Sequence, residues 1–144
     1  MRGLLILIVL FMLALIPYPS MVAPDWKITV MDEAHKPVRA IVRESYQNCS
    51  VESEGQESDA MTDELGRVSF PVRKIHASLL TRILGTLRSA TGGAHASFGP
   101  SAYVNAFGTE GEGSWEENGH IGFWRGSPAH LESTIVLHPM KSAY

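Results

Sequence analysis

The 144-residue sequence predicts a mainly β protein, a β-sandwich of about seven strands with one amphipathic helix inserted at about residues 77–90. Three observations support this prediction. Apolar and polar residues alternate in several short stretches, as they do in strands with one buried face. Clusters of Gly, Pro and Asp separate these stretches and are typical of turns. One longer segment has apolar residues at helical spacing instead.

The first 23 residues are predicted to be a targeting segment outside the fold. Thirteen consecutive apolar residues run from Leu4 to Ile16 after a short start that carries Arg2, which is typical of a secretory signal peptide. A helix of this length spans about 20 Å, short of the roughly 30 Å hydrocarbon core of a bilayer. We therefore expect residues 1–23 to be a signal peptide cleaved near Ala23, with an uncleaved tether as the alternative.

The composition of the whole chain is that of one globular domain, which we expect to comprise residues 24–144 and, because of the targeting segment, to be exported. Hydrophobic residues make up 44% of the chain and charged residues 19%, which excludes a disordered polyelectrolyte. A net charge of -3 gives no field that attracts nucleic acid, so we expect no nucleic-acid partner. The single cysteine excludes an intramolecular disulfide and a Cys-rich zinc site. The expected location is the periplasm, the cell envelope or the exterior.

Alternating patterns place the strands in order. Trp26 to Val30 has apolar side chains on one face, and a second alternating stretch runs from Val38 to about Tyr46. These two strands are expected to form a hairpin or to cross between sheets. The polar, acidic residues 47–64 are expected to form a loop that ends in a tight turn. Further strands are predicted at Val68 to Val72, Tyr103 to Phe107, Gly119 to Trp124 and Ser133 to His138.

The predicted helix runs from about Ala77 to Ala90. Ser78 is a candidate N-cap, and Gly85 weakens the helix by about 1 kcal/mol relative to Ala. Five aliphatic residues fall on one arc of the helix, namely Leu79, Leu80, Ile83, Leu84 and Leu87. Their burial would stabilise the fold by at most roughly 7 to 15 kcal/mol. We therefore expect this face to dock on a sheet, and Leu84→Asp to lower the melting temperature by many degrees.

Three stretches carry a family resemblance. Lys36 to Ala40 leads into the second strand, Thr62 to Phe70 holds a Thr-Asp-x-x-Gly turn followed by alternating apolar residues, and Thr134 to Pro139 forms the last strand. This order resembles the carboxypeptidase regulatory-like domains, which are small prealbumin-like β-sandwiches. The resemblance covers about residues 26–72 and 133–139, and the segment from about 74 to 100 departs from it.

The resemblance implies an exported, non-catalytic binding or accessory module of the cell envelope. A small transthyretin-like hydrolase is one alternative, because Trp124 to Ser127 is similar to the tetrapeptide that ends transthyretin-like hydroxyisourate hydrolases. Here, however, 17 residues follow that tetrapeptide. A structural or adhesive envelope domain is the other alternative. A pocket that unites His, Arg and Ser would favour the hydrolase, whereas an exposed apolar patch would favour adhesion.

Charge is segregated along the chain. Seven acidic residues and no Lys or Arg lie between Glu44 and Glu64, whereas residues 65–109 contain five basic residues and no acid. Four of the basic residues are candidates for binding an anionic polymer, a lipid headgroup or an acidic envelope protein: Arg73, Lys74, Arg82 and Arg88. The alternative is that the acidic loop folds against the basic stretch.

No catalytic residue, metal site or cofactor is predicted. The six histidines lack a recurrent metal-ligand spacing. Cys49 stands beside an acidic run rather than beside a basic group that would activate a thiolate, which argues against a nucleophile. Trp115, Phe123 and Trp124 are candidates for an aromatic sugar-stacking platform, with core packing as the alternative.

Overall fold

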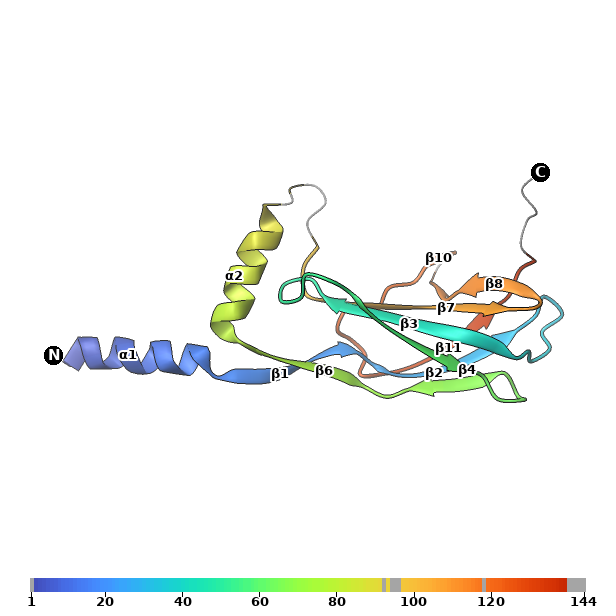
Figure 1. Cartoon of the computed structure of the whole chain (residues 1–144), viewed down its shortest axis with the longest axis horizontal. Coiled ribbons are helices and arrows are strands. Elements are labelled where there is room, and N and C mark those ends of the chain that lie inside the picture. Colours follow the sequence, from blue (N-terminus) through green and yellow to red (C-terminus); the bar gives the residue numbers. More distant parts are fainter. Residues whose placement is uncertain (1, 92, 94–96, 118, 140–144) are drawn as a thin grey trace.

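The computed structural model describes residues 2–91, 93, 97–117 and 119–139, which form a mainly β protein (Figure 1). There are two helices in this part of the chain, α1 (Arg2–Leu15) and α2 (Leu79–Ala90). The strands are β1 (Pro17–Ala23), β2 (Asp25–Met31), β3 (Ala40–Asn48), β4 (Gln56–Met61), β5 (Arg67–Phe70), β6 (Arg73–Ser78), β7 (Pro100–Gly108), β8 (Gly111–Ser114), β9 (Glu116–Glu117), β10 (His120–Ile121) and β11 (His130–Val136).

Two larger sheets share one core, an arrangement consistent with a β-sandwich. One has the strand order β11-β2-β5 and the other β4-β3-β7-β8, so together they hold the expected seven strands. All pairs in them are antiparallel except β11 with β2, which run parallel. The remaining strands form two short ribbons, β1 with β6 and β9 with β10.

The core is built from the inward faces of both sheets. Trp26, Ile28 and Val30 of β2 are buried, as are Val42 of β3 and Val104 of β7, so the predicted alternation at residues 26–30 is confirmed. The Trp26 indole Nε1 donates a hydrogen bond of 2.8 Å to Ser133 Oγ. This bond satisfies the polar edge of a ring whose burial stabilises the fold.

Most predicted strands are confirmed, but the structure also contains strands that the sequence patterns did not predict, among them β4, β6 and β8. Residues 47–64 contain strand β4, which pairs with β3 along its whole length. The side chains of β4 are mostly polar and exposed, so the strand lacks the apolar alternation on which the prediction relied. Gly119 to Trp124 forms the two-residue β10 and a bridge between Trp124 and Ala102. The strands at 26 and 38 lie in different sheets, so they cross between sheets rather than form a hairpin.

Residues 17–23 form strand β1, which belongs to the fold of the chain described here. β1 pairs with β6, and Val22 and Ala23 are buried. Ala23 is one of the core residues that contact Trp26 and its neighbours. Removal of residues 1–23 stays a prediction, but it would remove this strand and open the core at Ala23.

Helix α2 forms as predicted, but its expected packing is wrong. Ser78 is the N-cap, and its Oγ accepts a hydrogen bond from the Thr81 N–H. The apolar face points away from the sheets, because Leu79, Ile83, Leu84 and Leu87 are all exposed. A narrow polar face holds the helix to the rest of the chain instead. The packing on which the expected destabilisation by Leu84→Asp depends is therefore absent.

Helix α1 projects from the end of the ribbon that β1 and β6 form (Figure 1). All ten side chains from Leu4 to Leu13 are large and hydrophobic, and each is between 51% and 66% exposed. Neither described helix has the length and apolar character needed to cross a bilayer.

Candidate binding site

The outer face of the four-stranded sheet carries aromatic side chains. Along β7, Ala102, Val104 and Ala106 point into the core and are buried, so the intervening Tyr103, Asn105 and Phe107 point outward. Cross-strand pairing places Asn105 beside Ser114 of β8 and Phe107 beside Glu112. A row of ring, amide and hydroxyl groups therefore lies on one open surface.

These residues line a groove of about 870 Å³ between the sheet and the β9–β10 hairpin. Tyr103 and Phe123 form its aromatic end, with ring centroids 5.4 Å apart and planes tilted by 60°. The guanidinium of Arg125 lies 5.9 Å from the Phe123 centroid, within the range of a cation–π interaction. Ile121 adds an exposed aliphatic wall. The volume is within the usual range of small-molecule sites.

The other end of the groove is polar. Ser114 Oγ donates a hydrogen bond of 2.8 Å to Asn105 Oδ1, which leaves the Asn105 amide N–H groups available to a ligand. Glu112 and Glu116 add carboxylates, and His138 lies at this end with its Nδ1 3.0 Å from Glu33 Oε1. The groove thus combines ring faces with hydrogen-bonding groups and an acidic rim.

Close backbone packing fixes the polar end. Gly113 lies against the Val136 carbonyl oxygen, where a Cβ would overlap it. His138 and Glu112 exchange two backbone hydrogen bonds of 2.9 and 3.1 Å. The chain after β11 is therefore fastened to β8, which holds the rim of the groove in place.

An apolar row crosses the same sheet next to the groove. Ile41 of β3 pairs with Met61 of β4 and with Phe107 of β7, and all three side chains are exposed. The neighbouring row is ionic, since Arg43 makes two 2.8 Å bonds to Asp59. The Arg43 guanidinium holds the pKa of the Asp59 carboxyl below its usual range. This pair is exposed and contributes little net charge to the surface.

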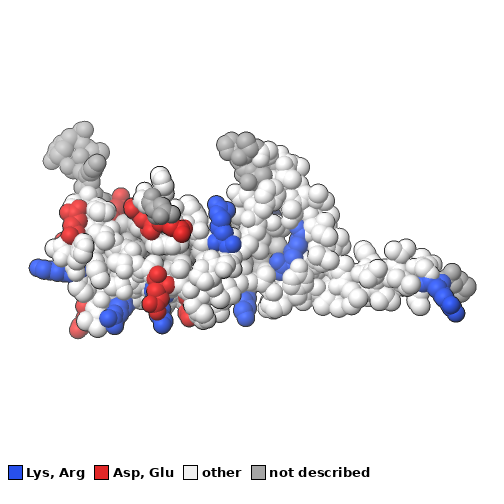
Figure 2. Space-filling view, turned by 180° about the vertical axis from the view of Figure 1, so that it is seen from behind, with Lys and Arg blue, Asp and Glu red and all other residues white. Residues whose placement is uncertain are grey.

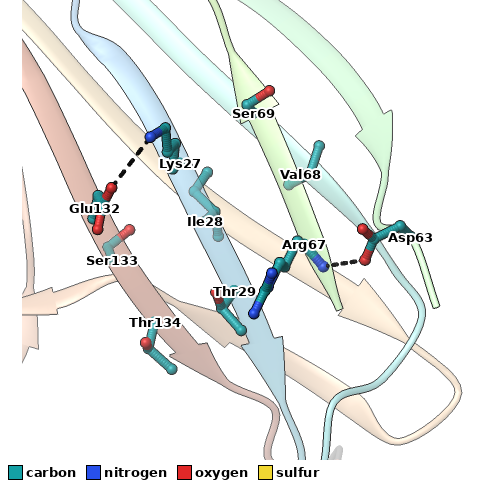
Figure 3. Close-up of a pocket in the computed structure, with 10 residues that line it drawn as sticks. All are labelled: Lys27, Ile28, Thr29, Asp63, Arg67, Val68, Ser69, Glu132, Ser133 and Thr134. Carbon is teal, nitrogen blue, oxygen red and sulfur yellow. Dashed lines mark hydrogen bonds and ion pairs between the residues drawn. The ribbon is translucent and has the colours of Figure 1, made fainter. Parts of the chain in front are cut away.

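The outer face of the three-stranded sheet holds a second hollow, of about 680 Å³ (Figure 3). Lys27 Nζ lies 3.4 Å from Glu132 Oε1, and both side chains are mostly exposed. Asp63 Oδ1 accepts 2.8 and 2.9 Å bonds from the Arg67 and Leu65 backbone N–H groups, which shapes the predicted tight turn. Lys27 and Glu132 neutralise each other and Asp63 shapes the turn, and no aromatic ring lines this hollow, so it offers a ligand less apolar contact than the aromatic groove does.

The four basic residues predicted to bind an anion differ in their contacts. Arg82 Nη1 donates to Ser20 Oγ at 2.9 Å and Nη2 to the Tyr18 carbonyl at 3.1 Å. Arg73 pairs with Glu44 at 3.4 Å. Lys74 and Arg88 are exposed. Two of the four side chains thus hold elements of the fold together, and anion binding stays a prediction.

Glu44 is a buried carboxylate on β3. Its side chain is fully buried, and Oε1 has no hydrogen-bond partner among the described residues. Burial raises the pKa of Glu44 to about 7, against the opposing effect of the Arg73 charge. Glu44 does not line either of the two hollows described above.

Other chemical candidates are dispersed in the described part of the chain. No three His, Cys, Asp or Glu side chains among these residues are placed to hold a metal ion. The two hollows described above and three smaller ones lined by described residues do not bring His, Arg and Ser together. Cys49 is half-buried, and its carbonyl accepts a bond from Ser89. His95 lies outside the described residues.

Of the three aromatic candidates, Phe123 alone faces the groove. Trp124 is buried, and Trp115 packs edge-on against Trp26 with centroids 5.1 Å apart. The sequence interpretation missed Tyr103 and Phe107, although they occupy the large, outward positions of a predicted strand. A search for known counterparts of the chain found no matching family model, characterised protein or solved structure.

Proposed function

We propose that the chain is an exported, non-catalytic binding module of the cell envelope, with the aromatic groove as its ligand site. The observation that carries this proposal is the tilted pair of the half-buried Tyr103 and the exposed Phe123, which lines the groove beside Asn105. Large rings left on a surface are costly to solvate and favour ligand contact. The sequence resemblance to carboxypeptidase regulatory-like domains is in keeping with an accessory role.

The ligand class that best fits this groove is a neutral or amino sugar of an envelope glycan. The apolar C–H face of a sugar ring packs on an aromatic side chain, while its hydroxyls bond to amide and carboxylate groups. The carboxylates of Glu112 and Glu116 disfavour an anionic polymer here. An anionic partner would have to bind another part of the chain.

Two alternatives remain as competing proposals. A transthyretin-like hydrolase would need its acid–base groups to converge, and the hollows described above do not unite them. An adhesive or structural domain is favoured by the exposed row of Ile41, Met61 and Phe107. The row shares Phe107 with the groove, but Met61 belongs to the row alone and Phe123 to the groove alone, so substitutions at these two positions separate the two binding proposals.

The test is binding of the purified chain to insoluble peptidoglycan and to soluble neutral and amino-sugar oligosaccharides. Tyr103→Ala and Phe123→Ala should each weaken binding at least tenfold, because each removes one stacking ring. Met61→Ala, on the same sheet but outside the groove, is the matched control and should bind as the parent does. Equal loss in the Met61 variant would favour adhesion through the apolar row. Absence of sugar binding would reject the groove as a glycan site. Separately, if the chain hydrolyses a sugar or ureide substrate and releases product, the non-catalytic assignment is rejected.

A further inference from the structure

Helix α2 is attached to the protein by its polar face, the reverse of an ordinary surface helix. Ser89 Oγ donates a 2.8 Å bond to the Cys49 carbonyl, and Arg82 reaches Ser20 and Tyr18 of β1. Between them, Gly85 packs on the Ser50 carbonyl so closely that a Cβ would overlap it. These three positions follow one another along one side of the helix. The leucine-rich side consequently points away from the protein.

Helix α1 exposes apolar side chains all around its axis. Its ten residues from Leu4 to Leu13 are all apolar and each more than half exposed. A helix with no polar face cannot be covered by one protein groove, which encloses a stripe rather than a whole circumference. Acyl chains can surround such a helix completely. The observation therefore favours lipid over a protein partner.

The two helices lie at the same end of the molecule. Figure 1 shows α1 continuing the line of β1, while α2 starts where the ribbon ends and rises steeply away from that line. The two helices are in contact. Where they meet, the Arg82 guanidinium lies 4.3 Å from the centroid of the Tyr18 ring. Tyr and Arg at the end of an apolar helix are typical of the boundary between acyl chains and headgroups.

Charge at this end is complementary to an anionic membrane surface. The elements α1, β1, β6 and α2 contain five basic residues and no acidic residue. Figure 2 shows acidic side chains over the sandwich and none over the helical end of the visible face. Basic residues near a bilayer are attracted to anionic headgroups. Lys74 and Arg88, which are exposed, are placed to make such contacts.

We propose that the helical end docks on an anionic lipid bilayer, with α1 among the acyl chains and the leucine face of α2 at the interface. At about 1.5 Å per residue, the 14 residues of α1 extend about 21 Å, more than one hydrocarbon leaflet of about 15 Å. The N-terminal segment then stays on the chain, and β1 with its buried Val22 and Ala23 remains in the fold. Docking is independent of the aromatic groove, so loss of sugar binding would leave it standing.

The test is co-sedimentation of the full-length chain with vesicles of phosphatidylcholine alone or with 30% phosphatidylglycerol. We expect binding to the anionic vesicles to exceed binding to the neutral vesicles at least fivefold at low salt. The paired substitution Ile83→Asp and Leu87→Asp should lower binding at least tenfold. Binding of this variant at the parent level would overturn the role of α2, and parent-level binding after deletion of residues 2–16 would overturn that of α1.

A further test is Leu84→Asp, with Met61→Asp as its matched control. The two side chains are equally accessible, at 57% and 58% exposed, but Met61 lies on the sheet and not on α2. The first should weaken vesicle binding and the second should not; equal loss in both would overturn a localised docking face. Circular dichroism checks that each variant keeps its fold. A stable lipid-free dimer whose formation is abolished by Ile83→Asp would assign the face to a second copy and overturn the lipid proposal.

Retention of the N-terminus has its own measurement. Intact mass of the chain recovered from the membrane fraction should include residues 1–23. A mass that begins near Pro24, in protein still attached to the membrane, would overturn docking through α1. Full-length chain recovered entirely in the soluble fraction would overturn docking by either helix.

Discussion

Glu44 of β3 and Arg73 of β6 form an ion pair with 3.4 Å between Oε2 and Nε. Arg73 also donates a 3.1 Å bond to Ser58 Oγ of β4, and its guanidinium lies 5.7 Å from the Tyr46 ring centroid. Arg73 thus links β6 to both β3 and β4 of the four-stranded sheet. The glutamate is the more buried partner and carries the cost of desolvation.

Stability should fall with rising pH because of Glu44. Its pKa in the folded chain is about 7, against an ordinary value of 4.5, so the folded state binds the proton more tightly. Its stabilising effect is fully present below pH 4.5 and is lost as pH rises to 7. The difference corresponds to roughly 3 kcal/mol. We expect Glu44→Gln to flatten this dependence and to be more stable than the parent at pH 8.

Chemical denaturation from pH 4 to pH 8 measures this effect, with the exposed Glu132→Gln as the control. The control should keep the slope of the parent. A Glu44→Gln variant with the parent's slope, or with lower stability than the parent at pH 8, would contradict a destabilising buried carboxylate.

Leu84→Asp should barely change the melting temperature in lipid-free solution. The side chain is 57% exposed, and surface substitutions usually alter the free energy of unfolding by less than about 0.5 kcal/mol. Val104→Asp, which buries a charge in the core, should cost about 4 kcal/mol or more. Differential scanning calorimetry of both variants checks the contrast. Comparable melting temperatures would mean that α2 packs by its leucine face after all.

Gly85→Ala should loosen α2 even though Ala is the better helix former. The added Cβ would overlap the Ser50 carbonyl oxygen, and overpacking of this kind costs about 1 to 3 kcal/mol. That exceeds the gain of about 1 kcal/mol in helix propensity. Limited proteolysis should cut faster near residues 88–91 in this variant. Thr86→Ala, on an exposed position of the same helix, serves as the reference, and equal cutting of both would refute close packing at Gly85.

Val22→Ala should destabilise the chain by about 2 kcal/mol, because it removes two buried methyl groups and leaves a cavity. Val22 is 1% exposed and belongs to β1, within the segment that the sequence pattern assigns to a signal peptide. Urea denaturation of the full-length variant measures the change. An unaltered midpoint would show that β1 contributes nothing to the folded domain.

Local patterns were sufficient for most of the individual elements. Alternation identified β2, β3, β7 and β11, and spacing with a serine cap identified α2, because side-chain period depends on the backbone conformation of the segment itself. β4 escaped detection, since its outward acids pair with Arg43 across the sheet and its inward residues are small or polar. The aromatic groove was missed for a related reason: Tyr103 and Phe123 are distant in sequence and meet through the bridge between Ala102 and Trp124.

The sequence by itself determined the periodicities, the turns, the apolar N-terminal run and the separation of acidic from basic residues, all of which depend on neighbours along the chain. The tertiary structure alone decided which face of α2 is covered, whether residues 17–23 pair with β6, and which carboxylate is buried. Amphipathicity shows that a helix has two unlike faces, but the face that is covered depends on what the rest of the chain places beside it. Here the backbone carbonyls of Tyr18, Cys49 and Ser50 meet its polar side, and the leucines are left outside.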